Sequence, residues 1–236
     1  MIEIKSIASS SKGNCYHITD GSTPLLIECG IHTKKISEAI NFGLSDICGC
    51  LISHSHFDHS MSVKDIMVKY GIDCYMSGET AKNLNLSSGH SLKIIEPMKQ
   101  FQIWSWDILP FKSVHDCEGS LGFILKSNEE KVLFLTDSAY CPYKFNDITH
   151  IMIECNYCED ILKENIDNGS IPIALKNRLL FSHMSLETLI KFFKANDLSK
   201  VKEIHLMHLS LGNSDKRIVK ESVQKATGKP VYICEA

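Results

Sequence analysis

Six consecutive residues contain four side chains of the kinds that bind metal ions. The hexapeptide His54-Ser55-His56-Phe57-Asp58-His59 offers three imidazoles and one carboxylate. Neutral imidazole and carboxylate are good ligands for zinc, iron and manganese. The chain has 11 histidines among 236 residues, so three of them with an aspartate in one hexapeptide is improbable by chance. The hexapeptide therefore predicts a metal site.

One loop cannot surround a metal ion, so further ligands must come from elsewhere in the chain. Three candidates follow apolar runs that are typical of strands, namely His115 after Ile108–Val114, Asp137 after Val132–Thr136 and His208 after Val201–Met207. Functional sites in α/β sheets gather at the carboxyl ends of strands. His205 lies three positions before His208, so in a strand the two would face opposite sides. The histidine at the strand end, His208, is the better candidate.

The elements that must position these residues come in two batches of strands, each followed by helices. We predict strands at Ile2–Ile7, Cys15–Thr19, Pro24–Glu28, Ile47–Ser53, Asp73–Met76, Phe101–Trp104, Ile108–Val114, Leu121–Lys126, Val132–Thr136, His150–Glu154, Val201–Met207 and Pro230–Cys234. We predict helices at Thr33–Phe42, Met61–Tyr70, Glu79–Leu84, Leu186–Ala195 and Ser214–Ala226. Two sheets packed face to face with helices outside would satisfy this order. No linker or repeat divides the chain, so one domain over residues 1–236 is expected.

The composition is that of an ordinary globular protein, with 44% hydrophobic and 22% charged residues. No apolar run approaches the roughly 20 residues needed to cross a bilayer, and the N-terminus lacks the pattern of a secretory signal. The ten cysteines are then expected to be reduced thiols in a cytoplasmic protein. Cys155 and Cys158 form a C-x-x-C, but no second ligand pair accompanies them, so coincidence explains them better than a zinc site.

The charge is distributed unevenly along the chain. Residues 1–159 carry 13 Lys and Arg against 19 Asp and Glu, a balance of -6, whereas residues 160–236 carry 12 against 9, a balance of +3. A mildly basic C-terminal third could line a track for a polyanion. A solvated surface with a lysine excess explains the same charges.

The ligand pattern resembles that of the metallo-β-lactamase-fold hydrolase superfamily. The match is H-x-H-x-D-H at His54–His59, followed in order by a histidine, an aspartate and a final histidine. Within the superfamily the chain resembles the YycJ/WalJ-like branch. The segments that carry this resemblance are Ser9–Asn14, Leu51–His54, Thr136–Ser138, Glu154–Asn156, Ser182–Ser185 and Leu206–Ser210. The resemblance implies an αββα fold, in the α/β class, with two central mixed sheets and helices on both outer faces.

The resemblance also implies two divalent metal ions, zinc or manganese with iron as a further choice. His54, His56 and His115 resemble the ligands of the first ion, and Asp58, His59 and His208 those of the second. Asp137 resembles the bridging carboxylate. Two ions bridged in this way hold a hydroxide between them and neutralise charge on a phosphoryl oxygen. Asp58 is expected both to bind metal and to orient the hydroxide or accept a proton.

Four further residues are candidates for supporting roles. His183 resembles a histidine that nuclease-like members use near the substrate, and it precedes a predicted helix N-terminus, which favours anions. It could steady a phosphate or protonate a leaving oxygen, although a histidine in a helix-start loop needs no such role. Asn14 and Asn156 could line the substrate pocket, and turns explain both almost as well. Glu28 stands where the superfamily has an acidic residue supporting the metal ligands, or is a charge at a strand end.

These inferences favour a metal-dependent hydrolase, specifically a phosphodiesterase or exonuclease acting on nucleic acid. The alternative on the same metal core is a small-molecule hydrolase acting on a cyclic phosphodiester, a thioester or a lactone. A non-catalytic binding protein is a third possibility, but such proteins usually lose ligands, and all seven positions are filled here. Neither a membrane nor an obligate protein partner is indicated.

Overall fold

Two compact units make up the chain. Residues 1–87 and 89–235 are described by the computed structural model, without the side chains of 173–175. Unit 1 comprises Met1–Lys112, Cys117–Glu130 and Glu235–Ala236, and unit 2 comprises Ser113–Asp116 and Lys131–Cys234. The four-residue segment Ser113–Asp116 belongs to unit 2, although unit 1 residues flank it on both sides. The prediction of a single domain over residues 1–236 stays a prediction.

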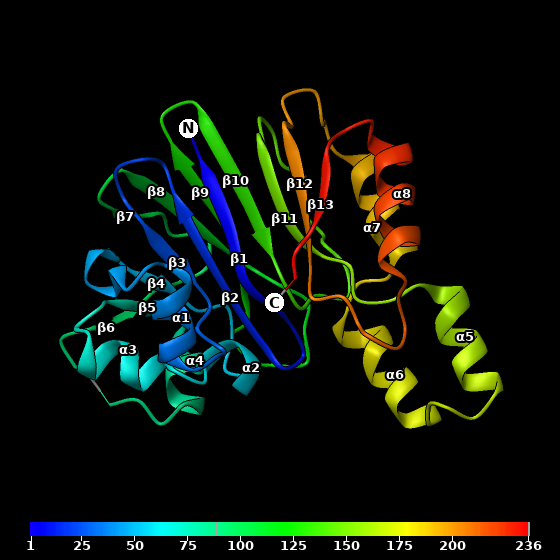
Figure 1. Ribbon diagram of the computed structural model, residues 1–236, viewed down its shortest axis with the longest axis horizontal. Coiled ribbons are helices and arrows are strands. Elements are labelled where there is room, and N and C mark those ends of the chain that lie inside the picture. Colours follow the sequence, from blue (N-terminus) through cyan, green and yellow to red (C-terminus); the bar gives the residue numbers. More distant parts are fainter. Residues whose placement is uncertain (88, 236) are drawn as a thin grey trace. The chain divides into compact units, whose positions relative to one another are not determined.

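Unit 1 contains most of the strands and four short α-helices (Figure 1). Its elements are β1 (Glu3–Ser10), β2 (Gly13–Thr19), β3 (Leu25–Ile27), α1 (Thr33–Ala39), the 3-10 helix η1 (Gly43–Asp46), β4 (Cys50–Leu51), α2 (Phe57–Ser60), α3 (Val63–Lys69), β5 (Cys74–Met76), α4 (Gly78–Asn83), β6 (Leu92–Ile94), β7 (Phe101–Ile103), β8 (Trp106–Lys112) and β9 (Leu121–Ser127). Strands β1 to β6 form one sheet in sequence order. The pairs β1–β2 and β2–β3 are antiparallel, and the pairs from β3 to β6 are parallel. Strands β7, β8 and β9 pair antiparallel.

Apolar side chains hold the helices of unit 1 against its six-stranded sheet. Ile36 of α1, Ile66 of α3 and Ala81 of α4 share one buried cluster with Leu26 of β3 and Met76 of β5. Burying one such side chain contributes about 1.5–3 kcal/mol. The cluster fixes β4, and with it the start of the loop that carries the metal-ligand hexapeptide.

Unit 2 is built on parallel strands with longer helices. Its elements are β10 (Glu130–Leu135, whose first residue belongs to unit 1), β11 (His150–Glu154), α5 (Glu159–Asp167), α6 (Ile173–Ser182), α7 (Leu186–Ala195), β12 (Glu203–Met207), α8 (Lys216–Thr227) and β13 (Val231–Ile233). Strands β10, β11, β12 and β13 are all parallel in that order. Figure 1 shows α7 and α8 side by side next to β13.

The helix boundaries in unit 2 follow from capping side chains. The Ser185 side chain accepts from the backbone N–H of Thr188 at the start of α7. Asp215 does the same for α8, and Gly228 ends that helix with a φ of 67°. Helices α5 and α6 were not predicted. Only Leu162 of α5 is buried, so an apolar periodicity is weak there.

The predicted fold class is confirmed. The chain has two mixed sheets with helices, as expected of the α/β class.

Candidate metal centre

Unit 1 gathers the four ligand-type side chains of the hexapeptide into one cluster. The hexapeptide begins three residues after β4, and α2 starts within it at Phe57. The Nε2 atom of His54 lies 3.0 Å from Nδ1 of His56. The rings of His54 and His59 are 4.2 Å apart between centroids, and Oδ2 of Asp58 lies 3.3 Å from Nε2 of His59. All four residues are therefore placed as neighbours.

Two polar side chains orient the imidazoles of this cluster. The Ser53 hydroxyl lies 2.8 Å from Nδ1 of His54, which leaves Nε2 of that ring as the outward-facing nitrogen. Glu28 is completely buried, and its Oε1 lies 3.7 Å from Nδ1 of His59. Burial raises the pKa of Glu28, although His59 and the hydrogen bonds from Ser53 oppose that shift. A carboxylate behind a ligating histidine is the usual supporting arrangement of metal sites.

Asn14 is buried against the same cluster. Its amide nitrogen lies 3.3 Å from Oδ2 of Asp58 and 3.1 Å from Nε2 of His59, and it donates to the Ser10 carbonyl over 3.1 Å. These contacts make Asn14 a positioning residue for two candidate ligands. Its predicted contact with substrate stays a prediction.

Gly30 leaves no room for a side chain beside the hexapeptide. A Cβ atom at Gly30 would overlap the carbonyl group of Asp58. The neighbouring backbone is tied to the hexapeptide, since the Cys29 N–H donates to the His59 carbonyl over 2.9 Å. Glycine is therefore required here for close backbone approach.

Unit 2 gathers a second group of ligand-type side chains. Asp137, Glu154, His183 and His208 each place one ligand atom within 4.8 Å of the others. The Nδ1 atom of His208 lies 3.4 Å from Oδ1 of Asp137 and 3.2 Å from Oε1 of Glu154. The rings of His183 and His208 stack with centroids 5.4 Å apart. Three of these four residues were predicted site residues.

His115 joins this group through Asp137 and His183. Its Nε2 lies 3.6 Å from Oδ2 of Asp137, and its ring centroid lies 5.5 Å from that of His183. Its Nδ1 lies 2.8 Å from the carbonyl oxygen of Ser182. Because a carbonyl can only accept, Nδ1 must carry the proton, and in the neutral ring Nε2 keeps its lone pair.

Glu154 is the residue of this group that sequence reasoning missed. It is completely buried at the end of β11, and its Oε1 lies 2.6 Å from Nδ1 of His183. Its Oε2 accepts from the backbone N–H groups of Ser138 and Met184. Burial raises the pKa of Glu154, but His183 and His208 outweigh it and lower the pKa below its usual value. Glu154 could have been found from the sequence, because it ends a predicted strand as Asp137 and His208 do.

Asn156 and His205 take different positions in unit 2. The amide nitrogen of Asn156 donates to the His208 carbonyl over 3.0 Å, so Asn156 holds the loop of that candidate ligand. Its side-chain oxygen is buried with no hydrogen-bond partner among the residues that the structure describes. His205 instead lies 3.0 Å from Glu203 and stacks on Tyr232. His208, not His205, therefore contacts Asp137 and Glu154.

Two of the candidate ligands adopt a strained backbone. Asp137 has a φ of 35° and His208 a φ of 53°, and each lies just beyond the end of its strand. Glu28 has a φ of 63°. A residue other than glycine in the left-handed region costs of order 1–3 kcal/mol and persists where the surroundings impose it, often at functional sites.

The donor sets of both units fit divalent metal ions. Each set combines imidazole nitrogens with carboxylate oxygens, the chemistry that zinc, manganese and iron accept. In unit 2 the Nε2 atom of His115 lies 3.2 Å from Oδ1 of Asp116 and 3.6 Å from Oδ2 of Asp137, which brings an imidazole and two carboxylates together.

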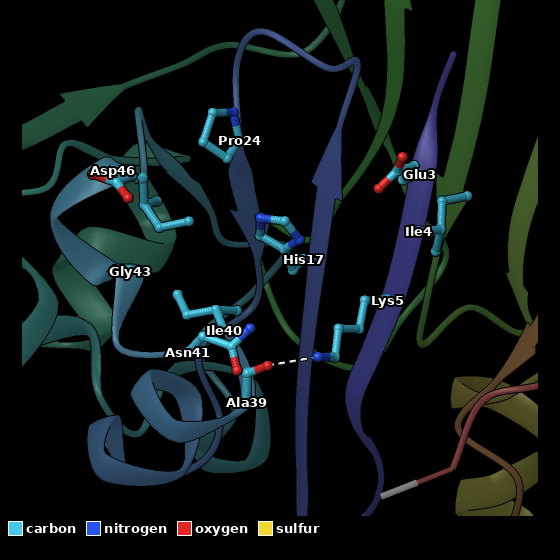
Figure 2. A pocket seen from close by; sticks show the side chains of 11 residues that line it. Glu3, Ile4, Lys5, His17, Pro24, Ala39, Ile40, Asn41, Gly43 and Asp46 are labelled. Atoms are coloured by element: carbon cyan, nitrogen blue, oxygen red, sulfur yellow. Dashed lines mark hydrogen bonds between the residues drawn. The ribbon is translucent and has the colours of Figure 1, made fainter.

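A separate cavity lies in unit 1 (Figure 2). Its volume is about 380 Å³, and β1, β2 and the segment from α1 to Ile47 line it. Figure 2 shows His17 and Lys5 in its wall, with the Lys5 ammonium donating to the Ala39 carbonyl over 2.6 Å. None of its described lining residues is a predicted site residue, so the cavity is not part of the candidate centre.

Across residues 1–87 and 89–235, every helix is too short or too polar to traverse a lipid bilayer.

The sequence matches known proteins along nearly its full length. Residues 11–99 match the model of the metallo-beta-lactamase superfamily. The chain is 28% identical over 227 residues to Exodeoxyribonuclease WalJ of Streptococcus pneumoniae, covering 90% of this chain and 83% of the relative. It is 22% identical over 236 residues to Exodeoxyribonuclease YycJ of Bacillus anthracis, covering 93% and 86%.

Solved structures agree on the fold. The metallo-beta-lactamase fold protein YhfI of Bacillus subtilis superposes with a TM-score of 0.74 at 15% identity, covering 100% of this chain and 97% of that one. The short form of human tRNase Z superposes with a TM-score of 0.64 at 13% identity, covering 100% and 96%. The predicted resemblance is confirmed: this chain is a metal-dependent hydrolase with the metallo-β-lactamase fold, and it is similar in sequence to the WalJ and YycJ exodeoxyribonucleases.

Proposed function

We propose that the chain is an exonuclease acting on DNA with two divalent metal ions. His54, His56 and His115 would hold the first ion and Asp58, His59 and His208 the second, with Asp137 bridging them. The observation that carries the metal proposal is the pair of donor groups, one in each unit, made of imidazoles and carboxylates that are mostly buried. The choice of DNA is supported by the curated relatives, which are named exodeoxyribonucleases.

The chemistry suits a phosphodiester. When bound, the ions lower the pKa of water and neutralise charge that develops on a phosphoryl group. The protein then has to place the ester and deliver protons. Asp58 is partly exposed, with 23% of its side chain accessible, and would accept a proton from the attacking water. Asn14 would hold Asp58 in that position through its amide nitrogen.

His183 would donate a proton to the leaving group. Its Nδ1 is occupied by Glu154, so Nε2 is the atom available to a substrate. Burial lowers the pKa of His183, but the charge and hydrogen bond of Glu154 together with Asp137 raise it above its usual value. A histidine that stays protonated near neutral pH can donate a proton to the departing oxygen.

The test combines metal analysis with a substrate panel. Elemental analysis of protein saturated with Zn²⁺ or Mn²⁺ and freed of excess metal should give two ions per chain. The panel contains end-labelled single- and double-stranded DNA, RNA, bis-p-nitrophenyl phosphate, a thioester and a lactone. The expected result is metal-dependent release of nucleotides from a DNA end. Thioester or lactone turnover without DNA cleavage would replace the proposal with the small-molecule alternative.

A further inference from the structure

The last turns of α6 expose an aromatic ring beside a cation. Phe181 is 75% exposed, and the Arg178 side chain is 59% exposed. Residues three apart on a helix lie on the same face, so Arg178 and Phe181 are neighbours. From Asn168 to Leu186 the chain has no acidic residue. This end of α6 therefore presents an apolar ring and, next to it, a guanidinium group that is bonded through its Nε to Asp116.

Two contacts fasten this turn to a candidate metal ligand. The Ser182 carbonyl, next to Phe181 in the chain, accepts the Nδ1 proton of His115 over 2.8 Å. The Arg178 Nε–H donates to Oδ2 of Asp116 over 2.9 Å, and Oδ1 of Asp116 lies 3.2 Å from Nε2 of His115. Phe181 is thus carried by a helix turn that is bonded directly to the candidate centre.

Two other exposed apolar side chains lie a few residues after candidate ligands of unit 2 in the sequence. Tyr140 lies three residues after Asp137 and is 51% exposed, and Leu211 lies three residues after His208 and is 75% exposed. Both side chains are thus held by the chain within three residues of a candidate ligand, as Phe181 is held near His115 by the Ser182 carbonyl.

Aromatic rings beside cations are the elements that bind single-stranded nucleic acid. A base stacks on the ring and the cation meets the backbone phosphate. A paired base inside a duplex cannot use such a ring, because both of its faces are already stacked. A ring near the cleavage centre therefore selects an unpaired base.

We infer that Phe181 stacks against the unpaired base at the strand end being cut, while Arg178 contacts its phosphate. The inference rests on the proposed function and specifies its substrate as a single-stranded or frayed DNA end. The apolar ring would separate this base from its partner strand and hold its phosphodiester at the metal centre.

The experiment compares oligonucleotides that differ only in one base. Fluorescence anisotropy measures the binding of single-stranded DNA in EDTA, where no cleavage occurs, with either a normal or an abasic nucleotide at each end in turn. Wild-type protein should bind the abasic strand about 5- to 160-fold more weakly at one end, which corresponds to the roughly 1–3 kcal/mol that stacking of one base contributes. Phe181→Ala should weaken binding of the normal strand by a similar factor and leave the abasic strand unaffected. Phe181→Trp should restore the difference.

Phe42→Ala is the matched control, since Phe42 is 74% exposed in unit 1 and lies outside the proposed site. It should retain the wild-type difference between the two strands. The inference is overturned if wild-type protein binds both strands equally, or if Phe181→Ala weakens both by the same factor. If the base effect is found but no DNA is cleaved with metal present, the inference stands and the proposed exonuclease activity fails.

Discussion

The Nδ1 nitrogen of His183 lies 2.6 Å from the Oε1 oxygen of Glu154, in a pair that is almost closed to solvent. The other oxygen of Glu154 accepts two backbone N–H groups, from Ser138 and Met184. The carboxylate is therefore fixed from behind, and it fixes the histidine in turn. A short charge-assisted hydrogen bond of this kind sets both the orientation and the protonation of an imidazole.

Replacing Glu154 by glutamine should lower the pKa of His183. Glutamine has nearly the same shape but lacks the negative charge that favours the protonated ring. The measurement is an NMR titration of the His183 ring in metal-free protein. Glu203→Gln is the control, because Glu203 contacts His205 and not His183. An unchanged His183 titration in Glu154→Gln would contradict the assigned role of this carboxylate.

Removing the His183 side chain should slow cleavage without releasing metal. The loss of one proton donor or charge-stabilising group costs roughly 10²- to 10³-fold in turnover. His183→Ala should therefore retain its metal content and its unfolding midpoint. The loss should be smaller for esters of p-nitrophenol, whose leaving group needs no proton. Loss of bound metal in this variant would instead make His183 a ligand.

Alanine at His56 or Asp137 should abolish hydrolysis, because each removes a proposed metal ligand. Elemental analysis should show fewer than two ions per chain in either variant. His205→Ala should keep most of its activity, since His205 contacts Glu203 and Tyr232. If His205→Ala is folded and inactive, the wrong histidine has been assigned to the metal.

Gly30→Ala should displace the hexapeptide. The added methyl group would overlap the backbone of Asp58, which cannot turn aside as a side chain can. Overpacking of this type costs about 1–3 kcal/mol, and metal affinity should fall with it. Gly78→Ala is the control, because the nearest atom to its Cβ would be 3.9 Å away. Urea unfolding and metal titration measure both effects. Equal metal affinity in the two variants would contradict the requirement for glycine at position 30.

The ionised Asp20 carboxylate should stabilise the folded state at neutral pH and lose this effect in acid. Burial alone would raise its pKa, but hydrogen bonds from Ser105, Ser127 and two backbone N–H groups together outweigh it and lower the pKa to about 2. A depressed pKa in the folded state means that the stabilisation is present above about pH 3.9, the unfolded value, and is lost as pH falls towards 2. Because Asp20 is partly open to solvent, which screens its charge, Asp20→Asn should cost less than about 1 kcal/mol at pH 7 and progressively less below pH 4. Urea unfolding across this range tests it, and a constant difference would contradict it.

The sequence predicted the two-sheet fold, and it showed ligand-type residues directly after apolar strands, because the residue that follows a strand can be read from the chain itself. Strands β10 to β13 also lie next to one another in their order along the chain, so their neighbours follow from the sequence. Glu154 was missed although it ends a predicted strand, and its pairing with His183 and His208, 29 and 54 residues away, could not be read from the sequence. The contrast between His205 and His208 was inferred from strand alternation. His208 in fact lies beyond β12 with a φ of 53°, where alternation no longer applies.

Helix α6 shows a second limit of prediction from the sequence. Its exposed face carries Phe181 and Leu180, so an apolar run there does not report burial. Periodicity arguments assume that apolar residues face a core, and a binding surface breaks that assumption. The exposed apolar side chains that kept this helix from being predicted are also the reason why we propose that it contacts substrate.

The segment Ser113–Asp116 limits where the chain can be divided into separate fragments. A four-residue excursion from unit 1 delivers His115 to unit 2. No single break in the chain yields two fragments that each hold one complete unit. A fragment ending at residue 130 would keep His115 but lose the Ser182 carbonyl that orients it. Domain exchange with relatives should therefore replace Ser113–Asp116 together with Lys131–Cys234, so that the histidine and the helix that holds it come from the same protein.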